Sequence, residues 1–302
     1  MDRRSVLQAA GGGAVLATVG LAGCLSAIPG IGGNDDTFES VAKWLPAPSA
    51  VNQDHYGVNT MDPYALIDAE DHLPDELNDI VANVEQMATE QLPGAASAED
   101  VEYLVTGNFG PFEGTFDVIE GEFDAEEIEE SLADESVTHV RTQGTFELYE
   151  TDVTHVGITD GTIIVANTTT PTETAATVVE TEAGDSPRYA SEHDGFDALT
   201  DEIPPGDIGH VKTTDPIEDP DLENGYLTGV VAKGAMFDVE GEEVSGTLAM
   251  VFEDESVIDE EELETALEGD GLQPFSDYEI DGNVVRMTET GPTEEFLGSE
   301  IV

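Results

Sequence analysis

The alternation of hydrophobic and polar positions after residue 100 is mostly that of short β-strands separated by turns. Residues 154–165 form two β-rich arms around Asp160-Gly161, and residues 278–285 repeat the pattern around a second Asp-Gly pair. An Asp-Gly pair between alternating apolar residues is a strong short-range hairpin signal. We therefore expect a β-rich protein built from antiparallel or mixed sheet.

Two helix starts interrupt the strands. Asp124 and Asp259 are each followed three residues later by a glutamate, Glu127 and Glu262, and then by an apolar pattern. This spacing predicts an N-cap and a capping-box pair. Each helix follows a strand that opens with Gly-Thr and precedes a hairpin. The chain is thus expected to be an α+β protein with two weakly repeated lobes, each with a sheet and a capped helix.

A longer helix is predicted before the first lobe. Residues 75–92 follow Pro74 and end at Pro93-Gly94. Five apolar side chains share one helical face: Leu77, Ile80, Val81, Val84 and Met87. We expect this amphipathic helix to pack on the sheet, with binding to a partner protein as the alternative.

The N-terminus has the layout of an export signal. Arg3 and Arg4 precede an apolar run over residues 9–23. As a helix this run would be about 22 Å long, too short for a hydrocarbon core of about 30 Å. It closes with Leu21, Ala22, Gly23 and Cys24.

The paired arginines resemble a twin-arginine signal, and the closing tetrad resembles a lipobox. The resemblance implies export by the twin-arginine translocase and a lipid on Cys24, which would anchor the chain at the outer face of the cell membrane. We accordingly divide the chain into a signal peptide (1–23), a lipidated cysteine with a flexible tether (24–37), an N-terminal α+β lobe (38–215) and a C-terminal β-rich lobe (216–302).

Composition indicates the solvent. The chain has 68 acidic and 8 basic residues, a formal net charge of −60, yet 39% of its residues are hydrophobic. That apolar content is enough for a core, which argues against an acidic disordered chain. With the signal, the composition resembles an exported lipoprotein of a halophilic archaeon. Nucleic acid is an unsuitable partner, because phosphate contacts need clustered lysine and arginine.

Candidate chemistry is sparse. Cys24 is the single cysteine, which leaves no disulfide and no copper–thiolate site for the folded part. His139, His155 and His210 each precede valine and would line a sheet surface, but their spacing matches no metal motif. We therefore predict neither a metal nor a cofactor.

Three polar segments remain as candidates. Gly184-Asp185-Ser186 resembles the nucleophile block of some lipases and esterases, although it lies in a turn-like stretch. Residues 215–225 are rich in carboxylates but lack the glycine position of an EF-hand. Asn167-Thr168-Thr169 is an N-glycosylation sequon, and Asn167 is a candidate glycosylation site.

Three functions fit these observations. The anchor and the absence of a catalytic motif favour a non-catalytic binding or envelope module on the cell surface. A solute-binding lipoprotein of a transport system is the first alternative, and aromatic residues would then line a cleft: Trp44, Tyr56, Tyr226 and Phe237. A surface hydrolase or metalloprotein is the second. The sequence leaves open whether the chain is an enzyme and favours the view that it is not.

Removing salt should unfold the protein. At 1 M salt the Debye length is about 3 Å, so neighbouring carboxylates hardly repel one another, whereas in dilute buffer their repulsion opposes folding. Circular dichroism during dialysis from multimolar salt to about 0.1 M NaCl should show loss of the native spectrum. An unchanged spectrum would contradict the interpretation of the composition.

Overall fold

The computed structural model describes residues 38–74, 101–110, 112–132, 137–150, 154–204, 206–269 and 272–297. The helix predicted over residues 75–92 lies outside these ranges, as do the signal and the tether. The chain divides into compact units at Asp35 and Asp36, and all described residues belong to the second unit. Its first described residue, Phe38, is buried.

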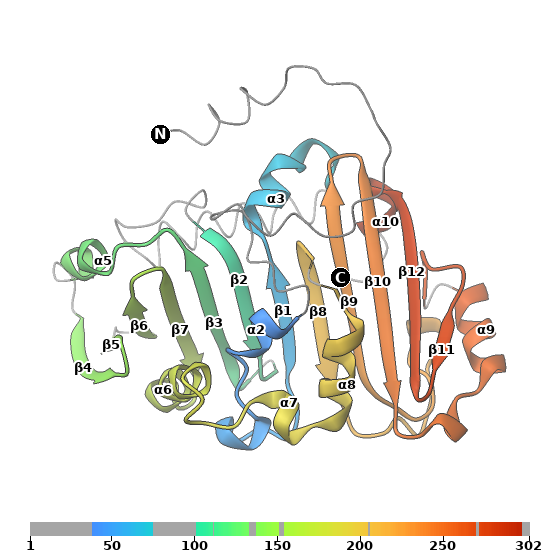
Figure 1. The fold of residues 1–302 in the computed structure, drawn as a ribbon, viewed down its shortest axis with the longest axis horizontal. Coiled ribbons are helices and arrows are strands. Elements are labelled where there is room, and N and C mark those ends of the chain that lie inside the picture. The colour runs from blue at the N-terminus through green and yellow to red at the C-terminus, as the bar shows by residue number, and fades with distance from the viewer. Residues whose placement is uncertain are drawn as a thin grey trace, which may run out of the picture. The chain divides into compact units, whose positions relative to one another are not determined.

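The second unit is built on one antiparallel sheet of twelve strands (Figure 1). The strands are β1 (Gly57–Met61), β2 (Val101–Asn108), β3 (Gly114–Gly121), β4 (Thr138–Gln143), β5 (Phe146–Glu150), β6 (His155–Thr159), β7 (Thr162–Thr168), β8 (Ile208–Thr213), β9 (Val230–Glu240), β10 (Glu243–Phe252), β11 (Glu279–Asp281) and β12 (Val284–Pro292). The helices are α2 (Glu39–Ala42), α3 (Pro63–Asp68), α5 (Ala125–Leu132), α6 (Pro171–Glu182), α7 (Tyr189–Glu192), α8 (Asp194–Glu202), α9 (Glu260–Glu268) and α10 (Thr293–Leu297). The protein is therefore β-rich and of the α+β class, as predicted.

The strand order is nearly symmetric about the β1–β8 pair. It runs β8, β9, β10, β12, β11 on one side and β1, β2, β3, β7, β6 on the other, followed by β5 and β4. Helix α5 follows β3, and α9 follows β10. The predicted boundary at residue 215 falls in the loop between neighbouring strands β8 and β9, so both predicted segments contribute to one sheet.

Both predicted hairpins are present, but the turn of the second lies one residue later than predicted. Strands β6 and β7 pair around Asp160-Gly161, where Gly161 has φ +75°. In the β11–β12 hairpin, Asp281 pairs with Val284, so the two-residue loop is Gly282-Asn283 rather than the Asp-Gly pair. Gly282 has φ +59°, a conformation that glycine adopts without strain.

Both predicted N-caps are present, but the predicted capping box of α9 is not. Asp124 Oδ1 accepts hydrogen bonds from the first-turn N–H groups of α5, and Asp259 Oδ1 does so for α9. Glu262 was expected to complete a box with Asp259. Its two carboxylate oxygens instead accept hydrogen bonds from the Thr228 N–H and hydroxyl, each at 3.0 Å. The prediction for Glu262 is wrong, because this loop offers donors that a local pattern does not reveal.

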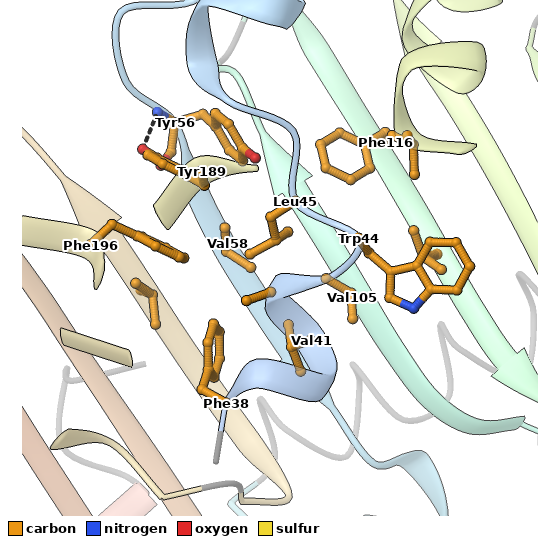
Figure 2. Packing of buried hydrophobic residues seen from close by; sticks show 14 of the residues in the cluster. Phe38, Val41, Trp44, Leu45, Tyr56, Val58, Val105, Phe116, Tyr189 and Phe196 are labelled. Carbon is orange, nitrogen blue, oxygen red and sulfur yellow. Dashed lines mark hydrogen bonds between the residues drawn. The ribbon is translucent and has the colours of Figure 1, made fainter. Parts of the chain in front are cut away.

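The first face of the sheet carries Val58 and Val211 and is covered by α2, α6, α7 and α8. Figure 2 shows Val41, Tyr189 and Phe196 in the core over Val58. Tyr189 of α7 is fully buried and stacks on Phe196 of α8, with ring centroids 4.2 Å apart. Its hydroxyl accepts a hydrogen bond from Tyr56 N–H, contacts the Tyr56 carbonyl, and lies 2.5 Å from Thr213 Oγ1. One side chain thus ties α7 to the segment before β1 and to the end of β8.

The second face carries Met61 and Ile208 and holds two separate cores. Helices α3, α9 and α10 pack over β8–β12, and α5 packs over β2, β3, β6 and β7. Met61 packs against both cores, so they meet at the centre of the sheet. The rest of the central strands on this face is polar.

Helix α6 was not predicted from the sequence. Threonine is a poor helix former because its β-branch restricts χ1. Here the Thr174, Thr177 and Thr181 hydroxyls each donate a hydrogen bond to the carbonyl four residues earlier. The buried side of α6 packs into the first-face core.

Replacing Tyr189 by phenylalanine should destabilise the protein by about 1–3 kcal/mol, because buried polar groups of Tyr56 and Thr213 lose their partner. Thermal unfolding in high salt measures the effect. Tyr226→Phe is the control, since Tyr226 is 43% exposed. Equal midpoints for both variants would show that the Tyr189 hydroxyl does not brace the fold.

Candidate functional site

The residues of the predicted anchor, namely Arg3, Arg4, Leu21, Ala22, Gly23 and Cys24, lie outside the described residues. Asn167 lies near the end of β7 and is exposed, with Thr168 beside it on the strand. No described helix is long and apolar enough to cross a membrane.

The three predicted strand histidines do not share a site. His139 pairs with Tyr149 and His155 with Glu150, which are successive residues of β5, so the two histidines point to opposite faces. Strands β1, β2, β3 and β7 separate His210 on β8 from His155 on β6. Within the described ranges, no group of three or more His, Cys, Asp or Glu side chains is arranged to hold a metal.

Neither hydrolase candidate in the described part of the chain combines an accessible hydroxyl with a hydrogen-bonded histidine. Ser186 lies in the turn after α6, where its N–H donates to the Glu180 carbonyl. His55 sits between Thr213 Oγ1 at 3.1 Å and Asp215 Oδ1 at 3.4 Å, an order that resembles a hydroxyl–histidine–carboxylate triad. However, Thr213 is only 1% exposed and the Asp215 side chain is 94% exposed. This hydroxyl is buried in the fold and cannot meet a substrate.

A second histidine lies beside this group. The rings of His55 and His193 are 5.5 Å apart and roughly perpendicular. Burial and then the neighbouring His55 lower the pKa of His193. His193 Nδ1 is buried without a hydrogen-bond partner among the described residues. His193 therefore packs as an aromatic ring against Tyr189.

The aromatic residues proposed to line a cleft are mostly in the cores. Trp44, Tyr56 and Phe237 are each 2–3% exposed. Only Tyr226 of this set is exposed, and its ring lies 5.7 Å from Lys233 Nζ. The first three aromatics therefore stabilise the sheet and do not form a binding surface.

The register of the central strands builds a polar surface on the second face. Directly opposed residues of an antiparallel pair point to the same side. One row crosses six strands, and the next crosses four. The polar band consists of Asn167, Thr115, Asn108, Gly57, Lys212 and Lys233 in the first row and Asp117, Thr106, Asn59 and His210 in the second.

The charged end of the polar band lies where β1, β8 and β9 meet. Lys212 and His210 are exposed, and Lys233 is half-buried. Asn59 Oδ1 lies 2.7 Å from His210 Nδ1. Burial, and then the positive charge of Lys212, lower the pKa of Lys233 to about 8. Burial and both lysines lower the pKa of His210. The band thus combines an accessible surface with an unusual concentration of positive charge.

This site is not visible in any local sequence pattern, although the sequence carries one signal for it. Lys212 and Lys233 are two of three lysines in a chain with 68 acidic residues. They are 21 positions apart in the chain, so only the β8–β9 register brings them together.

Comparisons with known proteins bear on the fold alone. Neither a known family nor a curated protein matches the sequence. Crystal form III of TP0453 is similar in structure, with a TM-score of 0.51 at 10% identity over 84% of this chain and 97% of that one. Form IV of the same protein gives 0.48 at 10% identity over 86% and 98%. The β-rich α+β fold therefore occurs in a solved structure.

A perturbed carboxyl outside the polar band has a structural role. Burial raises the pKa of Asp207 to about 7, and the Asp238 and Asp62 carboxylates add to the shift. Asp207 Oδ2 accepts a hydrogen bond from Val239 N–H at 2.7 Å. The carboxyl thereby fastens the start of β8 to β9.

Asp207→Asn should stabilise the protein above pH 7. In the native state the carboxyl binds its proton near pH 7, whereas in the unfolded chain it does so near pH 4. Its contribution to stability is therefore present at low pH and is lost as pH rises through about 7. Asparagine keeps the acceptor without the charge, so we expect a gain of about 1 kcal/mol at pH 8, reduced by solvent screening. The gap between the unfolding midpoints should narrow as pH falls from 8 and close at about pH 4, and a gap independent of pH would contradict this.

Proposed function

We propose that this chain is a lipid-anchored, non-catalytic binding module or envelope component at the outer face of the cell membrane. The twin-arginine translocase exports it folded, and a lipid on Cys24 attaches it. The N-terminal sequence supports the anchor, and the glycine-rich residues that follow Cys24 support the tether. Its solvent is concentrated salt.

The polar band supports a binding role. The surface of a sheet between two covering cores is normally either closed by further packing or adapted to solvent. Most charged side chains of this chain are carboxylates. The exposed centre of the second face carries Lys212, His210 and Asn59 instead. A solvated acidic surface does not require these residues. Recognition of a ligand gives them a role.

The two halves of the sheet are, in this proposal, repeats of one unit. The order β1, β2, β3, β7, β6 corresponds to β8, β9, β10, β12, β11, and the capped helices α5 and α9 occupy equivalent places. The hairpin of β4 and β5 is then an insertion in the first half. The polar band crosses the β1–β8 junction, so both repeats contribute to it.

Glycosylation of Asn167 is part of the same proposal. Its exposure on β7 allows a glycan, which would project from the far end of the polar band. The charged end, on β8 and β9, would stay clear of it.

Cys24→Ser tests the anchor. The variant should be exported and folded but should partition into the aqueous phase after membrane isolation in high salt, because it lacks the acyl chains that hold the wild type. Phase partitioning with detergent and mass spectrometry of the N-terminus measure this. Full membrane retention of the variant would contradict the proposed attachment.

A partner is sought by copurification of the wild type from membranes in high salt. Lys212→Gln is compared with Lys43→Gln, whose native lysine pairs with Glu120 at 3.0 Å on another part of the sheet. A bound component lost only from Lys212→Gln supports binding through the polar band. Components retained equally by both variants argue against it.

A further inference from the structure

Lys212 and Lys233 stand in an arrangement that a folded protein normally avoids. They are direct cross-strand partners on β8 and β9. Like charges in this position destabilise a sheet. The chain has only 8 basic residues and places two of them opposite each other, although 68 acidic residues were available as partners. Salt relieves the repulsion incompletely, because half-buried groups such as Lys233 are screened less than exposed ones.

Neither lysine has a carboxylate partner in the described part of the chain. The ion pairs there involve Lys43, His55, His139 and His155. Lys233 Nζ donates to the Gly225 carbonyl at 3.3 Å and lies near the Tyr226 ring. These neutral contacts orient Lys233 without neutralising its charge.

Further donors lie beside the lysines. With the Asn59 amide oxygen 2.7 Å away, His210 Nδ1 donates its proton to that oxygen. The opposite ring nitrogen, Nε2, therefore becomes a second donor when the ring is protonated. The side-chain amide nitrogen of Asn59 adds further donors. Two ammonium groups, an imidazole and an amide thus meet on one patch of the sheet.

Gly57 keeps the patch open. It is the cross-strand partner of Lys212 on β1 and contributes no side chain. A Cβ at this position would lie 3.4 Å from His210 Cε1. A larger residue here would fill the space beside Lys212 and His210. The exposed donors therefore border an area where the sheet backbone itself is accessible.

We propose that Lys212, Lys233 and His210 bind a phosphate group, with Asn59 holding the imidazole in place. This inference rests on the proposed binding function and names its ligand class. A phosphate monoester carries a charge of about −1.5 to −2 near pH 7, so one group matches two ammonium charges. A carboxylate carries a single charge and would leave one lysine uncompensated.

The pKa values of Lys233 and His210 are both lowered in the proposed site. Burial is the largest cause for both groups, and neighbouring positive charge adds to it. A bound dianion would favour the charged form of each group and raise both pKa values. In concentrated salt only short contacts discriminate between anions, because charges are screened beyond a few ångström. The ligand must therefore touch these donors directly.

The test measures binding of inorganic phosphate to the full mature protein, in detergent and in chloride salt that keeps it folded. Isothermal titration compares the wild type with Lys212→Gln, Lys233→Gln and the control Lys43→Gln. Because a hydrogen bond to a charged group is lost, each band variant should bind phosphate about tenfold more weakly or worse. The control should bind as the wild type does, and all variants should keep the native circular-dichroism spectrum.

A second readout separates binding from folding. Phosphate should raise the unfolding midpoint of the wild type and of Lys43→Gln but not that of Lys212→Gln, since a ligand stabilises only the state that it binds. Absence of phosphate binding by the wild type overturns the proposal. Equal binding by Lys212→Gln and Lys43→Gln also overturns it.

The source of the phosphate is distinguished with vesicles. The flotation assay uses the Cys24→Ser protein, so that the lipid anchor does not contribute. It compares vesicles that contain a phosphate-monoester lipid with vesicles of pure phosphatidylcholine. Flotation that depends on Lys212 assigns the site to a lipid headgroup, and titration without flotation assigns it to a free phosphate compound. If the proposed anchor is wrong, only the phase partitioning of Cys24→Ser shows it. If the proposed phosphate site is wrong, the titration shows it.

Discussion

The antiparallel ladder between β1 and β8 is the contact on which the rest of the structure depends. It joins two sets of strands that are far apart in the chain through five residue pairs, from Gly57 with Lys212 to Met61 with Ile208. On the first face, the Tyr189 hydroxyl braces this junction against Tyr56 and Thr213. On the second face, the same register aligns the polar band. Core and candidate site are therefore opposite sides of one ladder.

The sequence predicts those parts of the fold whose signals are local. The Asp160-Gly161 hairpin and the caps at Asp124 and Asp259 depend on a few adjacent residues, and all three are present. Helix α6 was missed because its threonines suit strands, although Thr170-Pro171 with Glu173 carries a helix-start signal. Strand order and register join residues distant in the chain. Without them, neither the single sheet nor the polar band could be inferred.

The polar band also differs chemically from the rest of the chain. Carboxylates dominate the composition, and concentrated salt makes their crowding tolerable. Lys212 and Lys233 oppose that tendency at the centre of the sheet, where like-charged neighbours and the half-burial of Lys233 reduce stability. Groups that reduce stability are typical of functional sites, where ligand binding compensates for them. We propose that the anchor, the tether and this patch together present a small anion-binding surface outside the cell.

The most direct measurement is a diffraction structure of the mature protein crystallised from high salt with phosphate. We predict an ordered phosphate in contact with the Lys212 and Lys233 ammonium groups, with His210 Nε2 directed towards it. Asn59 should keep its hydrogen bond to His210 Nδ1. Lysine ammonium groups paired instead with carboxylates of the same chain, and no anion on the polar band, would contradict the account.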